Sequence, residues 1–381
     1  MGTRVVNSQW IVLAVLSAAL VTTRGSRADP TETSPEQIAP YLTPQQLVHI
    51  EKGRTINLVC LGHGSPTVIL TAGLGNWSLA WRLVQSPLTK KTRVCAWDRA
   101  GYGFSSPSPE PQDIVHTTKD LERTLKSAGI RPPYVMVGAS LGAYEALRFT
   151  DLHRHSVAGM VLVDPSIPDQ NALMERIAPL LHTKTRALDK QLVQQLQHCA
   201  AELRSGMLKR GAPQFEQCTA APAVPADFPR LKAAIARLNA DPARLLTQAS
   251  TVMEFDSDAA HDSREVINTQ RRYGEMPLIV LTGGRDESSL DFLVGSATPA
   301  EVAEFHKQVA QFLRDTWGPA HDAYAALSTR GRHHLVPDSG HGIQNENPEV
   351  VISGIIEVLD ETRANATREA VAVPPTANAH E

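Results

Sequence analysis

One pentapeptide, GASLG at residues 138–142, constrains the fold of this chain more than any other feature. It follows an apolar run (134–137) typical of a buried strand and precedes a helix-prone stretch. A G-x-S-x-G sequence in that context forms a sharp turn that lifts the serine hydroxyl above the sheet, at a helix N-terminus. Gly138 and Gly142 are expected because side chains beside the serine would clash. The pattern predicts that Ser140 is a nucleophile.

A serine hydroxyl needs a base to remove its proton, and that base is expected late in the chain, on a loop after the last strand. His341 lies in the sequence VPDSGHG, directly after an expected strand at 334–336. Gly340 and Gly342 let the loop bend over the edge of the sheet. His341 is therefore the predicted base.

The acid that orients His341 is expected at the end of a strand between the serine and the histidine. Two aspartates meet this condition: Asp286 follows the expected strand 278–282, and Asp164 ends the expected strand 160–163. An acid after the penultimate strand is the commonest arrangement. The sequence therefore favours Asp286, and Asp164 is the alternative, which otherwise caps a turn.

An oxyanion hole needs two backbone donors. The N–H of Leu141, the residue after the nucleophile, is the first. The second is expected in the glycine-rich loop AGLGNW (72–77), which follows an apolar strand. Leu74 is the predicted donor, and Gly73 lets its backbone approach a substrate oxygen. Without the serine motif, this loop would be interpreted as a plain turn.

Short apolar runs alternate with amphipathic stretches through most of the chain, which is typical of a mainly parallel sheet. The block 165–276 breaks this rhythm, because it is helix-prone and holds no convincing buried strand. The strand pattern resumes at Leu278. We therefore predict a core of residues 47–164 and 277–361 with an inserted helical cap, in preference to a separate helical domain.

The two ends of the chain are predicted to lie outside this core. Residues 1–28 hold an apolar run with small residues before Ala28, which predicts a secretory signal peptide cleaved there. An uncleaved anchor is the alternative, but the run is shorter than the ~20 apolar residues of a spanning helix. Residues 29–46 are expected to be a linker or a loosely docked arm, and residues 362–381 a mobile tail. The protein is thus expected to be exported, to the periplasm or the medium.

The motifs TVILTAGLG, DRAGYGFSS, GASLG, LTGGRD and DSGHG, in this order, resemble the α/β-hydrolase superfamily, above all its capped branch of esterases, proline iminopeptidases and epoxide hydrolases. The resemblance implies a mixed, mostly parallel eight-stranded sheet with helices on both faces and a cap over the pocket. It also implies a serine–histidine–acid triad with no metal or other cofactor. Serine at position 140 argues against dehalogenases and epoxide hydrolases, which use an aspartate nucleophile. Ala72, Ala139 and Ala143 depart from residues that many members carry.

The four cysteines form no C-x-x-C pair, which excludes a zinc ribbon and a thioredoxin-like motif. The family strand order would place Cys60 and Cys95 on neighbouring strands, either as a disulfide or as buried thiols. Cys199 and Cys218 both lie in the expected cap, where an exported protein could bridge them.

The expected function is an exported serine hydrolase acting on a small to medium carboxylic ester through an acyl-enzyme. Alternatives with the same triad are a proline iminopeptidase-like aminopeptidase of amide substrates, a lactonase and an acyltransferase. A non-catalytic binding protein of this fold is an alternative of another class. The net charge of −3 offers no basic stripe for nucleic acid. No stable membrane anchor is expected, and the sequence makes no prediction of the oligomeric state.

Overall fold

The computed structural model describes residues 33–256, 268, 270–285, 287–295 and 297–372, so the predicted signal peptide lies outside the described residues. A single eight-stranded sheet has the order β1-β2-β4-β3-β5-β6-β7-β8. Its strands are β1 (Gln46–His49), β2 (Thr55–Leu61), β3 (Thr67–Thr71), β4 (Val94–Trp97), β5 (Tyr134–Ala139), β6 (Val157–Val163), β7 (Leu278–Gly283) and β8 (Gly331–Val336). The β1–β2 and β2–β4 pairs are antiparallel and the remaining pairs are parallel. The mostly parallel mixed sheet predicted from the sequence is confirmed.

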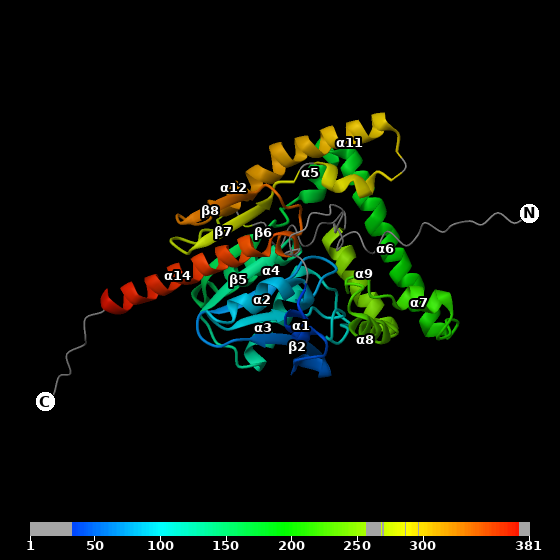
Figure 1. The fold of residues 1–381 in the computed structure, drawn as a ribbon, viewed down its shortest axis with the longest axis horizontal. Coiled ribbons are helices and arrows are strands. Elements are labelled where there is room, and N and C mark those ends of the chain that lie inside the picture. The colour runs from blue at the N-terminus through cyan, green and yellow to red at the C-terminus, as the bar shows by residue number, and fades with distance from the viewer. Residues whose placement is uncertain (1–32, 257–267, 269, 286, 296, 373–381) are drawn as a thin grey trace, which may run out of the picture.

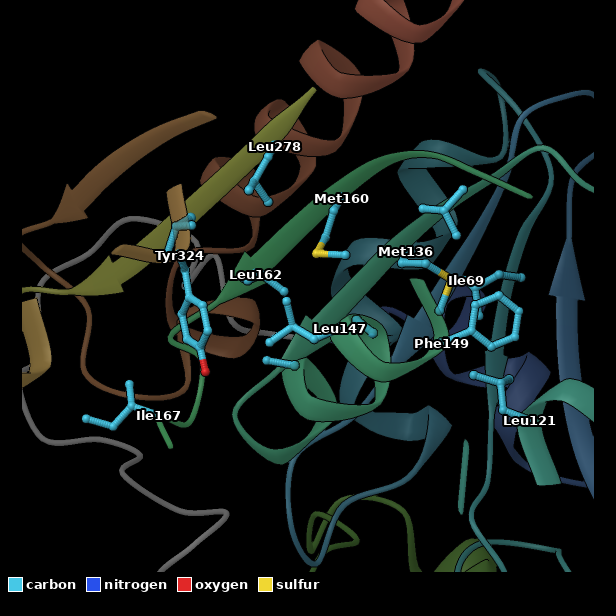
Figure 2. Packing of buried hydrophobic residues seen from close by; sticks show 14 of the residues in the cluster. Ile69, Leu121, Met136, Leu147, Phe149, Met160, Leu162, Ile167, Leu278 and Tyr324 are labelled. Atoms are coloured by element: carbon cyan, nitrogen blue, oxygen red, sulfur yellow. The ribbon is translucent and has the colours of Figure 1, made fainter. Parts of the chain in front are cut away.

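Helices cover both faces of the sheet because its central strands are apolar on both sides (Figure 1). On β3, Val68 and Leu70 belong to one core cluster and Ile69 to the other. The first face is covered by α2 (Arg82–Leu88) and α14 (Pro348–Ala372). The second is covered by α3 (Ile114–Ser127), α4 (Leu141–Leu152), α11 (Pro299–Phe312) and α12 (Gly318–Ala325). Figure 2 shows this second core, with Leu147 and Phe149 of α4 packed among strand side chains such as Met136.

In the described part of the segment between β6 and β7 there are five helices and no strand. They are α5 (Gln170–Ile177), α6 (Pro179–Ser205), α7 (Pro213–Thr219), α8 (Pro229–Asn239) and α9 (Pro242–Asp256). We call residues 165–276 the cap. A proline in the first turn opens α6, α7 and α8, and Gly206 ends α6 in a left-handed conformation. In Figure 1, α6 to α9 lie together at one side of the sheet, away from the C-terminal end of α14.

Both cysteine pairs are bridged. The Cys60–Cys95 disulfide joins β2 to β4, where the two residues are register partners with Cα atoms 4.0 Å apart. The Cys199–Cys218 disulfide joins α6 to α7. The second bridge therefore closes the cap on itself, and the first ties the antiparallel edge to the parallel sheet.

Both ends of the described chain form helices. Ser34 caps the short helix α1 (Pro35–Ile38), and the buried Tyr41 donates a hydrogen bond to Gln85 Oε1 at 2.5 Å, so this part of the arm is docked on α2. At the other end, α14 continues to Ala372, so residues 362–372 of the expected tail are helical. Alanine, glutamate and arginine in this stretch favour a helix. The stretch lacks the periodic apolar residues from which an amphipathic helix is predicted.

Shorter elements connect the larger ones. They are α13 (Ile343–Glu346), 3₁₀ turns at Ala39–Tyr41, Glu51–Gly53, Ser78–Trp81, Arg154–Ser156 and Glu287–Leu293, and a π-helical turn at Leu313–Trp317. Among the helices of the described residues, none combines the length and the apolar character that crossing a membrane requires.

Candidate active site

The turn that carries Ser140 joins β5 to α4. Ser140 has φ 50° and ψ −121°, a positive-φ conformation that side-chain-bearing residues rarely adopt. Its N–H donates to Val163 O at 3.1 Å, at the end of the neighbouring strand β6. Such a strained backbone persists only where its surroundings hold it, and it is characteristic of functional turns. The structure therefore presents Ser140 at the carboxyl edge of the sheet, in front of a helix N-terminus.

Two glycines make this turn possible by allowing close backbone approach. A Cβ atom on Gly138 would lie 2.4 Å from the carbonyl oxygen of Gly142. A Cβ atom on Gly142 would lie 2.3 Å from the carbonyl oxygen of Thr71. Both neighbours are backbone atoms that cannot rotate away, so the two positions require glycine for steric reasons.

We expect Gly142→Ala to lower the free energy of unfolding by about 3 kcal/mol, because the added methyl group must displace the backbone of β3. Gly354→Ala in α14 is the matched control: its Cβ would meet Ile279 at 3.7 Å, an ordinary contact distance. That variant is expected to be neutral or stabilised by up to about 1 kcal/mol. Urea denaturation of both variants measures the difference, and equal stabilities would contradict the close packing at Gly142.

His341 is paired with Asp164, the alternative acid predicted from the sequence. The Nδ1 atom of His341 donates to Asp164 Oδ2 at 2.5 Å. The other carboxylate oxygen, Oδ1, accepts from the Gly283 N–H at 3.0 Å and from Trp317 Nε1 at 3.2 Å. Three donors from β7, the turn after α11 and the histidine loop thus fix the Asp164 carboxylate. Asp164 is buried, whereas half of the His341 side chain is exposed.

The two groups shift each other's pKa in opposite directions. Burial favours the neutral carboxyl of Asp164, but the hydrogen bond and charge of His341 outweigh it, so the pKa of Asp164 lies below its usual value. Burial would also lower the pKa of His341. The hydrogen bond to Asp164 and the charges of Asp164 and Glu346 instead raise the pKa of His341 above 6.5. The pair therefore favours an imidazolium beside a carboxylate.

Asp286, the acid favoured by the sequence, lies outside the described residues. The carboxylate that contacts His341 is that of Asp164, which follows β6 directly and has φ 41°. Because Ala139 and Val163 are register partners, Ser140 and Asp164 leave adjacent parallel strands at the same edge. The sequence signal for this residue was its place after the apolar run of β6.

The Ser140 hydroxyl faces a second serine. Its Oγ lies 3.4 Å from Ser166 Oγ, and the Ser166 N–H donates to Ser140 O at 3.2 Å. Within the part of the chain that the structure describes, no hydrogen bond joins Ser140 Oγ to His341.

The loop after β3 lies against the turn that carries Ser140. A Cβ on Gly73 would be 3.2 Å from Ser140 Cβ and 3.8 Å from its Oγ. Leu74 and Leu141, the two predicted donors, belong to one apolar cluster with Val252 of α9. The backbone at Gly73 therefore lies beside the Ser140 side chain, directly before the N-terminus of α4.

A cavity of about 110 Å³ lies between the core and the cap. Leu74, Trp77 and Tyr102 line it from the core, and α6 and α9 line it from the cap. Its wall includes the Cys199–Cys218 disulfide. The buried Arg244 of α9 fixes the cap above it, since it donates to Gly103 O at 2.5 Å and Ser105 O at 2.9 Å. The cavity is mostly apolar and reaches Leu74, whereas Ser140, Asp164 and His341 are not among its lining residues.

The model of the family described as "Alpha/beta hydrolase family" matches residues 58–353, more than half of the chain. Among curated proteins, "Uncharacterized protein YqjL" of Bacillus subtilis (strain 168) is 32% identical over 108 residues, which span 28% of this chain and 43% of YqjL. The chain spans less than half of the length of the curated relatives that it matches in this way.

Solved structures show the same fold. A probable hydrolytic enzyme from Pseudomonas aeruginosa PAO1 has a TM-score of 0.53 and 20% identity, over 82% of this chain and 92% of that chain. The epoxide hydrolase CorEH has a TM-score of 0.52 and 16% identity, over 83% of this chain and 98% of that chain. At these identities the likeness concerns the fold alone.

Proposed function

Because the chain belongs to the alpha/beta hydrolase family, we propose that it is a serine hydrolase that cleaves small to medium carboxylic esters through an acyl-enzyme intermediate. Ser140 is the nucleophile, His341 the base and Asp164 the acid. The observation that carries the proposal is the 2.5 Å bond between His341 and the buried Asp164, at the sheet edge where the strained Ser140 turn lies. Asp164 replaces Asp286 in the proposal because it supplies this contact.

In the first half of the reaction, His341 takes the proton of Ser140 as Oγ attacks the acyl carbon. Asp164 holds the Nδ1–H tautomer and stabilises the imidazolium that forms. The N–H groups of Leu74 and Leu141 donate to the oxyanion, and His341 then protonates the leaving group. In the second half, His341 activates a water molecule that releases the acid.

The cavity beneath the cap supports a small substrate. Its volume of about 110 Å³ is somewhat below the roughly 150 Å³ of an engineered apolar cavity that binds benzene in another protein. An acyl or alcohol group of a few carbon atoms, or one ring, would fill it. The apolar wall of Leu74, Trp77 and Leu196 favours a hydrocarbon group over a charged one.

Export is part of the proposal. The Cys60–Cys95 and Cys199–Cys218 disulfides support an oxidising compartment, where such bridges persist. Cleavage of the predicted signal peptide near Ala28 would deliver the protein there. Mass spectrometry of the mature N-terminus tests the cleavage site.

Covalent labelling of the folded protein with a fluorophosphonate tests the mechanism, with Ser140→Ala as the control. We expect one phosphonyl group on the tryptic peptide that contains Ser140 and none on the variant. If the protein is labelled, its rates of hydrolysis of a panel of esters, lactones and aminoacyl amides distinguish an esterase from a lactonase or an aminopeptidase. A folded protein that takes up no label would contradict the proposal and favour a non-catalytic binding protein.

The pH dependence of kcat/KM should follow the ionisation of His341. The reaction needs the neutral imidazole, and Asp164 raises the pKa of His341 above 6.5. Activity is therefore expected to rise with pH through an apparent pKa above 6.5. In the residual activity of Asp164→Asn, this acid limb should move to lower pH, because the raising charge is gone. An unchanged limb would show that another group controls the titration.

A further inference from the structure

A second ion pair lies fully buried behind the candidate site. Arg99, two residues after β4, donates from Nε to Glu145 Oε1 at 2.6 Å and from Nη2 to Glu145 Oε2 at 2.7 Å. Glu145 is on α4, five residues after Ser140, and the two side chains are 3% and 1% exposed. A buried ion pair contributes little net stability, because taking both charges out of water offsets their attraction. Stability alone does not explain a pair at this place.

The same guanidinium also holds the loop after β3. Its Nη1 donates to Gly73 O at 3.1 Å and its Nη2 to Ala72 O at 2.5 Å. The Thr71 hydroxyl donates to Glu145 Oε2, so the end of β3 is bound to α4 as well. Arg99 and Glu145 thus connect the helix that begins at the nucleophile with the loop that passes beside it.

Gly73 O accepts from Arg99 Nη1 and also from the Asn76 N–H at 3.2 Å, and these two bonds together set the direction of the next amide. The peptide between Gly73 and Leu74 is not among the cis bonds of the chain, so its C=O and N–H point in opposite directions. A donor that fixes the Gly73 C=O on one side of the peptide bond therefore directs the Leu74 N–H to the opposite side of that bond. In the part of the chain that the structure describes, this N–H donates to no other group. Gly73 itself lies against Ser140.

We propose that Arg99 and Glu145 are positioning residues that aim the Leu74 N–H at the oxyanion of the acyl-transfer reaction. The inference rests on the proposed serine hydrolase function. An oxyanion hole works because its donors are oriented before charge develops, and a donor that must reorient loses much of its effect. The guanidinium suits this task, because its planar fork binds one carboxylate and two carbonyls at once, which a lysine ammonium does not reproduce.

The test compares Arg99→Met, Arg99→Lys and Glu145→Gln with the control Arg54→Met. Arg54 forms a bidentate pair with Asp120 at 2.7 Å for both bonds, with side chains 8% and 4% exposed, and it contacts neither the oxyanion loop nor α4 through these bonds. Each arginine variant leaves a buried carboxylate without its partner, and Arg99→Met in addition loses the bonds to Ala72 O and Gly73 O, which are the bonds under test. Glu145→Gln keeps the side-chain shape and serves if Arg99→Met does not fold.

Removing one oxyanion donor costs about 10²- to 10³-fold in kcat, so we expect misaiming it to lower kcat about 10- to 100-fold. KM for the same ester should change by less than about threefold, because ground-state binding is untouched. Inhibition by an alkyl boronic acid, which forms a tetrahedral adduct, should weaken in parallel with kcat. Arg99→Lys should show the same loss of kcat as Arg99→Met, and Arg54→Met should keep the wild-type kcat.

The inference is overturned if the Arg99 and Glu145 variants, at equal folded fraction, keep the kcat and boronic acid affinity of Arg54→Met. That result is distinct from failure of the proposed function, which would appear as a wild-type protein that takes up no fluorophosphonate. Urea unfolding of each variant gives the folded fraction needed for the comparison.

Discussion

Ser140→Ala is expected to lower kcat for an ester substrate by about 10⁴- to 10⁶-fold, the range observed when a triad nucleophile is removed. The methyl group cannot form the acyl-enzyme, whereas the Leu74 and Leu141 amides remain and leave a small residual rate. KM should change little, because the hydroxyl contributes to the transition state more than to binding. Steady-state kinetics on the purified variant, with labelling to exclude contaminating enzyme, measures the loss.

Ser166→Ala is the matched control for this variant. Ser166 is 1% exposed, and its hydroxyl lies 3.4 Å from that of Ser140, so the same change is made beside the proposed nucleophile. Only one weak hydrogen bond is lost, which limits the expected fall in kcat to about tenfold. If kcat falls further in Ser166→Ala than in Ser140→Ala, Ser140 is not the nucleophile.

The fold could be predicted from the sequence because its signals are local. The turn around Ser140 needs a strand, two small residues and a helix within about 20 residues, and all of these stand together in the chain. The buried strands read as unbroken apolar runs, and β6 is an example at Val157–Val163. The helical insertion at residues 165–276 could be predicted because it contains no such apolar runs. Each inference used neighbouring residues only.

The partner of His341 could not be fixed in this way. Asp164 and His341 are 177 positions apart, and their contact depends on where the loops after β6, β7 and β8 end. The choice between the two aspartates used the order of strands along the chain, and that order gives no information about the distance of either carboxylate from His341. The donors that hold Asp164, Gly283 N–H and Trp317 Nε1, come from two further segments. The Arg99–Glu145 pair was missed for the same reason, since no local pattern connects β4 with α4.

Asp164→Asn is expected to lower kcat about 10⁴-fold, as the equivalent change does in triads that have been measured. An amide cannot balance the charge of the imidazolium, and its NH₂ group can hold the ring in the wrong tautomer. The shape of the side chain is kept, so the bonds from Gly283 and Trp317 can survive at one oxygen. The free energy of unfolding should also fall, because the lowered pKa of Asp164 stabilises the fold above its ordinary pKa of 3.8.

Asp286→Asn separates this expectation from the acid that the sequence favoured. It should keep the wild-type kcat if Asp164 is the acid, since one carboxylate suffices to orient His341. The opposite outcome, an inactive Asp286→Asn with an active Asp164→Asn, would mean that the Asp164–His341 bond only anchors the loop. The pH profile distinguishes these cases independently: the acid limb of kcat/KM moves to lower pH only in the variant that removes the carboxylate acting on His341.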